Sequence, residues 1–157
     1  MPRLKTPEDV EAWFLRYGWF PGRNIGRRAD DLVAEVIAEY RAEGVDLCPL
    51  EPATAFLREH GLLRLVICPR RGDSIVFEPA KTWPGDPADV RALADLLGVE
   101  LFPIGYDTSE GSSVLMDGRG RFFCVHETGN YYMGADRAEA FISLGNAPMR
   151  DAEEFSA

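Results

Sequence analysis

The chain has 157 residues and a formal net charge of −9 at pH 7, with 46% hydrophobic and 27% charged residues. This length and composition predict one globular domain with a single core and exclude a wholly disordered chain. The acidity argues against a nucleic-acid-binding protein, because phosphate recognition needs a basic face; it favours a basic protein partner or simply keeps the chain soluble.

Residues 6–17 predict the first helix. Thr6 suits the N-cap and Pro7 suits the first helical position. Four apolar residues then follow at helical spacing and form one stripe: Val10, Trp13, Phe14 and Tyr17. Gly18 follows as a stop signal, so we expect the helix to end there.

Residues 17–28 predict a fixed joint between this helix and the next. We expect three residues to set the angle between the helices: Trp19, Phe20 and Pro21. Gly18 and Gly22 permit the backbone bends. Three arginines could form a phosphate patch: Arg23, Arg27 and Arg28. The adjoining Asp30 and Asp31 favour a solvated loop or ion pairs instead.

Two more helices are expected before the first strand. Asp30 or Asp31 is expected to cap the second, which Gly44 ends. Its buried face holds Leu32, Val33, Val36, Ile37 and Tyr40. Pro52 opens a short third helix and Gly61 closes it.

From Leu62 onward the pattern predicts strands. Residues 62–77 predict a hairpin around a turn at 69–73, and a helix is expected from Asp86-Pro87 to Gly98. Further strands are predicted at 99–106, 113–116, 122–126 and 131–133, with a tight primed turn at Asp117-Gly118 and a last helix capped by Asp136. The acidic tail 148–157 is expected to fray.

These elements predict one α+β domain over residues 1–157, with an ordered core at about 6–147. A mixed, mostly antiparallel sheet is flanked by four or five helices, because the connections between the later strands are too short for parallel crossovers.

Three cysteines at wide, unpatterned spacing suit neither a disulfide framework nor a zinc site: Cys48, Cys68 and Cys124. Cys124 and His126 share a strand face and could form a nucleophilic pair, but the apolar neighbours of Cys124 favour a buried structural thiol. His60 ends a helix, where a cation suits the dipole. We expect no catalytic residue, no metal and no cofactor.

The chain starts with a polar helix signal rather than an apolar leader, and no apolar run approaches the length of a membrane span. Together with the cysteine pattern, this predicts a cytoplasmic protein that is neither exported nor embedded in a membrane.

The charge is unevenly distributed along the chain. Residues 1–78 hold 11 Lys/Arg against 13 Asp/Glu, and residues 79–157 hold 6 against 13. Tyrosines and a tryptophan lie among the carboxylates of the second half, as in an interface for an Arg/Lys-rich partner, unless their rings face the core. The candidate partner-binding residues are Trp83, Tyr106, Asp107, Glu110, Glu127, Tyr131 and Tyr132.

Several segments, in this order, resemble the third family of the SUKH superfamily over residues 6–145. The most specific is Gly18-Trp19-Phe20-Pro21-Gly22-Arg23 before the second helix. Others are Ala55–Leu62, Leu97-Gly98, Leu101–Gly105 and Met116–Arg121.

The resemblance implies a SUKH-like α+β fold and a non-catalytic immunity protein of a bacterial polymorphic-toxin system. Such a protein binds and inhibits a cognate toxin, commonly a nuclease or another nucleic-acid-targeting domain. The motif residues are then structural, and none is catalytic. The alternative is a regulatory or scaffold module of the same fold that binds other proteins.

Overall fold

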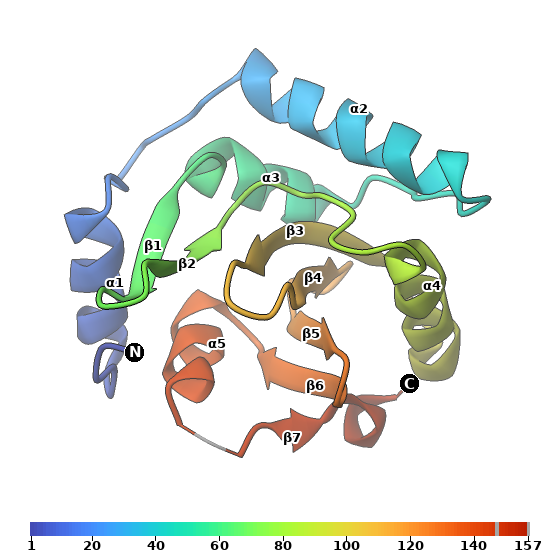
Figure 1. Cartoon of the computed structure of the whole chain (residues 1–157). Helices are drawn as coiled ribbons and strands as arrows, with labels where there is room; N and C mark the ends of the chain where they lie inside the picture. Colours follow the sequence, from blue (N-terminus) through green and yellow to red (C-terminus); the bar gives the residue numbers. More distant parts are fainter. Residues whose placement is uncertain (147, 157) are drawn as a thin grey trace.

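The fold is organised around one seven-stranded sheet, in which each strand pairs antiparallel with its neighbour in the chain. The structure is a computed structural model and describes residues 1–146 and 148–156. Figure 1 shows the strands in order: β1 (Arg64–Cys68), β2 (Asp73–Val76), β3 (Leu101–Asp107), β4 (Ser113–Asp117), β5 (Phe122–His126), β6 (Gly129–Gly134) and β7 (Arg150–Asp151).

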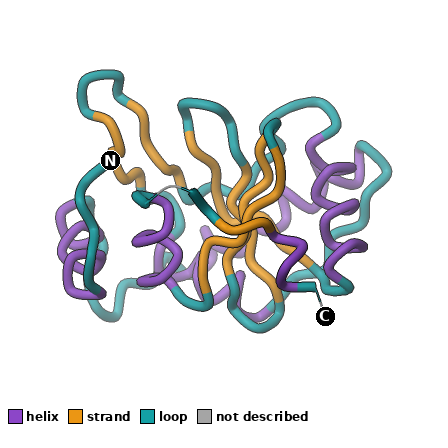
Figure 2. The backbone as a smooth tube through the Cα atoms, turned by 90° about the horizontal axis from the view of Figure 1, so that it is seen from below, coloured by secondary structure: helices purple, strands orange, loops and turns teal. Residues whose placement is uncertain are grey.

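The described residues form five α-helices and one 3-10 helix, which flank the sheet. They are α1 (Pro7–Arg16), α2 (Arg27–Ala42), α3 (Glu51–His60), α4 (Asp86–Leu97), α5 (Arg137–Leu144) and η1 (Ala152–Phe155). Figure 2 shows helices on both sides of the strands. The predicted α+β domain with a mostly antiparallel sheet and about five helices is confirmed.

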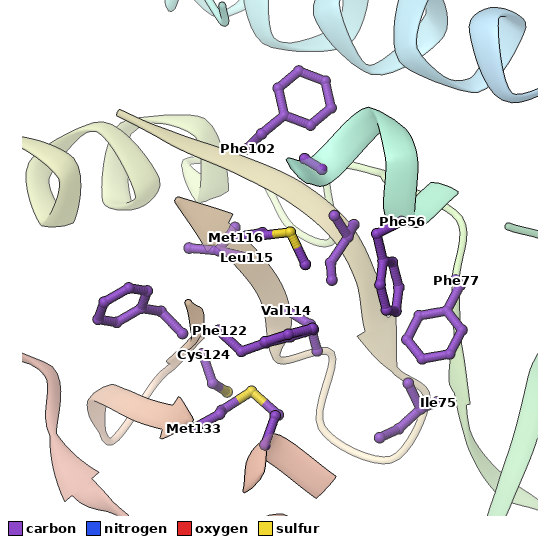
Figure 3. Packing of buried hydrophobic residues seen from close by; sticks show 14 of the residues in the cluster. Phe56, Ile75, Phe77, Phe102, Val114, Leu115, Met116, Phe122, Cys124 and Met133 are labelled. Atoms are coloured by element: carbon purple, nitrogen blue, oxygen red, sulfur yellow. The ribbon is translucent and has the colours of Figure 1, made fainter. Parts of the chain in front are cut away.

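An aromatic core joins three of the helices to one face of the sheet. Phe14 of α1 stacks on Phe77 with ring centroids 5.9 Å apart, and it meets Phe141 of α5 edge to face at 5.3 Å. Phe56 of α3 packs edge to face on Phe77 at 5.1 Å and on Phe122 of β5 at 5.5 Å (Figure 3). Edge-to-face pairs of this kind add to the stabilisation from burial, so these rings fix the positions of α1, α3 and α5.

Two predicted helix caps are confirmed and one is wrong. Thr6 and Asp9 form a capping box at the start of α1, and Asp136 accepts the backbone N–H of Glu139 at the start of α5. The second helix begins at Arg27, before the predicted caps Asp30 and Asp31. The preceding Gly26 has φ +58 and its N–H is held by Asn24 Oδ1 at 2.7 Å, so the chain turns into the helix earlier than expected.

The turn between β4 and β5 is longer than the predicted two-residue turn at Asp117-Gly118. The Asp117 side chain is buried and accepts the backbone N–H groups of Arg119 and Arg121 and the Arg121 Nε at 2.7 Å. Gly120, at φ +82, takes the left-handed position. The Asp117 N–H donates to the Arg121 carbonyl at 3.1 Å and closes a three-residue loop over residues 118–120. The carboxylate stabilises this loop, in which the glycine needed is Gly120 rather than Gly118.

The C-terminal segment 148–157 is predicted to fray, but its residues 150–155 form β7 and η1 against the sheet. β7 pairs with β6, and Ala152 of η1 is fully buried. The Phe155 ring stacks on Tyr132 with centroids 3.6 Å apart. The Arg150 guanidinium carbon lies 4.5 Å from the centroid of the same Phe155 ring. Phe155 therefore supplies the apolar contact that holds this segment, and the acidic composition of the segment did not predict it.

The joint between α1 and α2 is fixed by the end of α3. Trp19 is buried, and its Nε1–H donates to Glu59 Oε1 at 3.0 Å. Arg23 donates to the carbonyls of Glu59 and Gly61, at 2.8 and 2.9 Å, instead of pairing with the neighbouring aspartates. Phe20 was predicted to help fix the joint, but it is 55% exposed.

His60 is neutral, so the predicted cation at the end of α3 is wrong. Burial, followed by the nearby Arg137, lowers the pKa of His60 to about 3. Nδ1–H donates to the Phe56 carbonyl at 3.2 Å, and Nε2 accepts Arg137 Nη1 at 2.9 Å. The cation here is Arg137, which lies over the Phe14 and Trp19 rings at 4.7 and 4.4 Å.

Candidate functional site

The strongest candidate site is a cavity of about 560 Å³ at one end of the sheet. In an antiparallel sheet alternate connections lie at the same end, and this end holds the β3–β4 loop and the β5–β6 turn. The start of α4 closes the side. We call this the Trp83 cavity; it is lined by Trp83, Asp89, Ala92, Glu110, Val125, His126, Glu127, Thr128, Gly129 and Asn130.

Trp83 forms one wall of the cavity and is held in place from two sides. Its Nε1–H donates to Asp89 Oδ2 at 3.2 Å, across the first turn of α4. The preceding Thr82 donates its N–H and Oγ1–H to Asp86 Oδ2 at 2.9 and 3.1 Å. Ser113 Oγ of β4 donates to the same carboxylate at 3.0 Å. Asp86 therefore ties the tryptophan loop to the sheet.

Asp86 is fully buried, and this burial raises the pKa of its carboxyl above the ordinary value. The three donors from Thr82 and Ser113 act in the opposite direction and compensate part of the desolvation. A carboxylate kept in the interior with three donors is a rigid anchor, because none of these bonds can be replaced by water.

The opposite wall is built around His126 at the end of β5. Its Nδ1 accepts the backbone N–H of Thr128 at 3.1 Å and lies 2.7 Å from Thr128 Oγ1, which itself lies 2.9 Å from the Tyr131 hydroxyl. Since a backbone N–H can only donate, the proton of the neutral ring is on Nε2.

Glu110 covers the other side of the histidine ring. Its Oε2 lies 2.7 Å from His126 Nε2. This oxygen does not lie along the N–H direction, and Nε2 has no aligned hydrogen-bond acceptor among the described residues. The pair is a close electrostatic contact rather than an aligned hydrogen bond.

The Trp83 cavity is strongly acidic. Three carboxylates face it from three different elements: Asp89 from α4, Glu110 from the β3–β4 loop and Glu127 from the β5–β6 turn. Among the described residues that line it, none is lysine or arginine. The walls therefore combine three carboxylates with an indole ring. Such an arrangement suits a cationic group and disfavours a phosphate.

A second cavity, of about 340 Å³, adjoins the first and shares Glu110, His126 and Thr128 with it. Asp107 and Tyr131 contribute to its lining. Asp107 Oδ1 accepts the N–H groups of Ser109 and Glu110, both at 2.9 Å. Asp107 therefore orders the loop that carries Glu110.

The structure brings together five of the seven predicted partner-binding residues around these two cavities: Trp83, Asp107, Glu110, Glu127 and Tyr131. Tyr106 lies half-buried on β3 opposite Ser113 and lines neither cavity. Tyr132 is only 9% exposed, because Phe155 covers it.

Four polar residues of the Trp83 cavity were not predicted as partner-binding residues: Asp89, His126, Thr128 and Asn130. The alternation along β5 placed His126 on a face with Cys124. Both residues line the second cavity, but no hydrogen bond among the described residues joins their side chains. Burial raises the pKa of Cys124 to about 12, which keeps the thiol protonated.

The described residues offer neither a metal site nor a membrane-spanning helix. They contain no group of three or more His, Cys, Asp or Glu side chains that could hold a metal ion. They also include no helix whose length and apolar character would let it cross a bilayer.

A comparison with protein-family models matches residues 6–147 to SUKH-3, described as SUKH-3 immunity protein. This range covers most of the chain, including every element from α1 to α5 and the whole Trp83 cavity. Comparisons with curated proteins and with solved structures found no match.

Proposed function

Because the chain belongs to the SUKH-3 immunity protein family, we propose that it binds a cognate bacterial toxin of a polymorphic-toxin system and neutralises it in the cytoplasm. The toxin is a basic protein, a nuclease or another nucleic-acid-targeting domain. Its docking surface on this chain is the acidic end of the sheet, which we define as Asp89, Asp107, Glu110 and Glu127.

The observation that carries this assignment is the Trp83 cavity, with its three carboxylates and an indole on rigid elements. A protein that binds nucleic acid needs a basic face to neutralise phosphates. An acidic surface that covers this face competes with the nucleic acid directly, and its long-range attraction speeds the encounter. We therefore assign inhibition by binding, with no reaction of its own and no nucleic-acid or membrane partner.

Two arginines of the β1–β2 turn, Arg70 and Arg71, lie at the same end of the sheet. The Arg71 Nε lies 2.7 Å from Asp73 Oδ2, which compensates the charge of Arg71. Arg71 lines a separate cavity with Cys68 and Asp107, and neither arginine lines the Trp83 cavity. The acidic end, with its four carboxylates, therefore keeps an excess of negative charge.

The test is toxin neutralisation. The chain is co-expressed with the toxin domain encoded beside it, and survival and complex formation are measured for the wild type and for Glu110→Lys/Glu127→Lys. Glu35→Lys, at an exposed position on α2, makes the same kind of charge reversal away from the site. We expect protection by the wild type and Glu35→Lys and loss of protection by the double variant.

Failure of the wild type to bind or neutralise any neighbouring toxin would contradict the immunity function. Recovery of a housekeeping complex in a pull-down would then favour the regulatory or scaffold alternative.

A further inference from the structure

We propose that the Trp83 cavity is a recognition pocket for one arginine side chain of the partner protein. The identity of that partner rests on the proposed function, whereas the preference for a guanidinium group rests on the walls of the cavity alone.

The chemistry of the cavity walls favours a cation. An indole face attracts a cation within about 6 Å of the ring, and tryptophan is the best of the aromatic rings for this contact. Here the indole stands beside Asp89 and shares its cavity with Glu110 and Glu127. A cation that enters meets the ring and a carboxylate together, while an anion meets three carboxylates and no lysine or arginine among the described lining residues.

The placement of the three carboxylates favours arginine over lysine. The three carboxylates come from separate elements, so acceptors surround the cavity rather than converging on one point. A guanidinium group is planar, offers five N–H donors in different directions and stacks on aromatic faces. An ammonium is a compact, strongly hydrated point charge, so it can satisfy one carboxylate but not several walls at once.

The walls of the cavity are already held in place before a ligand binds. The Trp83 loop is tied to the fully buried Asp86 and also to Glu43, the C-cap residue of α2. Gly85 N–H donates to Glu43 Oε1 at 3.0 Å, and Lys81 Nζ lies 2.9 Å from Glu43 Oε2. Asp107 holds the loop that carries Glu110. Walls that are already in place lose little conformational entropy on binding.

The size of the cavity agrees with this occupant. A volume of about 560 Å³ is within the range of about 300–1,000 Å³ typical of ligand clefts. It therefore admits a long side chain together with part of the backbone that carries it.

The test needs no toxin. N-acetyl-arginine amide is titrated into the ¹⁵N-labelled full chain, and the Trp83 indole N–H resonance is followed. Trp13 and Trp19 are buried, so their indole signals are internal references. We expect saturable shifts at Trp83 with a dissociation constant of about 1 to 10 mM. The references should not move.

Matched ligands test the specificity. N-acetyl-citrulline amide has nearly the same shape without the charge, and N-acetyl-lysine amide has the charge without the planar group. We expect the citrulline compound to cause no shift and the lysine compound to bind at least about threefold more weakly. Equal binding of all three ligands, or no shift at about 50 mM arginine compound, would overturn the proposal.

Matched variants test the walls. Glu110→Gln and Glu127→Gln each remove one charge with little change of shape, and we expect each to weaken binding about twofold to fivefold. Trp83→Leu should weaken it at least as much. Glu35 is exposed on α2, away from the cavity, and the Glu35→Gln variant should bind as the wild type does. Unchanged affinity in the two pocket glutamine variants would also overturn the proposal.

The result can be separated from that of the proposed function. Selective arginine binding without toxin neutralisation would retain the pocket and reject the immunity role. Neutralisation without selective arginine binding would retain the immunity role and reject the pocket.

Discussion

At the scale of single residues, the buried charged and polar groups decide which parts of the chain are rigid. His60 is enclosed by the rings of Phe14, Trp19 and Phe56, and its two nitrogens bond Phe56 and Arg137. An imidazolium would place a second cation against Arg137 in this apolar site. The neutral ring is therefore required for the native packing.

Stability at low pH tests this role of His60. Its folded pKa of about 3 lies below its ordinary value of 6.5, so the unfolded chain binds more protons between these two values. The free energy of unfolding consequently rises with pH across this window and falls on acidification. Between pH 7 and pH 4 we expect the wild type to lose up to about 3 kcal/mol more than His60→Gln.

Urea denaturation of both proteins at several pH values measures this difference. The carboxylates titrate in both chains, so the difference between the two curves isolates His60. Parallel curves for wild type and variant would show that His60 titrates normally in the folded protein.

At the scale of elements, the joint between α1 and α2 acts as the cap of α3. Arg23 satisfies two carbonyls at the end of that helix, and Trp19 bonds the Glu59 side chain beside them. A helix end leaves several carbonyls without intrahelical partners, so a bidentate donor from a distant loop stabilises both the end and the loop. This explains how residues 18–23 shape the scaffold from outside the site.

Replacement of Arg23 by lysine should break this link. Lysine keeps the charge but cannot donate in a fork to two carbonyls, and we expect the free energy of unfolding to fall by about 1–3 kcal/mol. Arg27→Lys, at an exposed position four residues later, is the matched control and should change it by less than about 0.5 kcal/mol. Thermal and urea denaturation measure both, and equal losses would contradict the capping role.

Local signals predicted the elements well where the cause was local. The predicted cap at Thr6 and the predicted helix stop at Gly98 depend on residues within one turn, and both are confirmed. The start of α2 is an exception, because its cause is also local: Asn24 Oδ1 accepts the Gly26 N–H two residues later, and the helix begins before the predicted caps. The packing of residues 150–155 depends instead on the contact between Phe155 and Tyr132, about which the hydrophobic periodicity carries no information.

At the scale of the whole molecule, the meander collects acidic loops that are far apart in the sequence. Charge counts predicted that the second half is acidic, and five of the seven predicted partner residues line the two adjoining cavities. The sequence could not predict that Trp83 faces Asp89 or that His126 is held by Thr128. Both contacts depend on how a loop meets a helix or a turn after the sheet has formed.

We propose that this acidic end is the surface on which the toxin docks. The most direct test is the association rate of the cognate toxin, measured by stopped flow at low and high salt. The proteins are the wild type, Glu110→Lys/Glu127→Lys and the control Glu35→Lys.

We predict that the wild type and the control associate at similar rates that fall as salt rises, because opposite charges steer the encounter. The double variant should associate at least about tenfold more slowly at low salt and depend less on salt. A double variant that associates as fast as the control at every salt concentration would contradict the account.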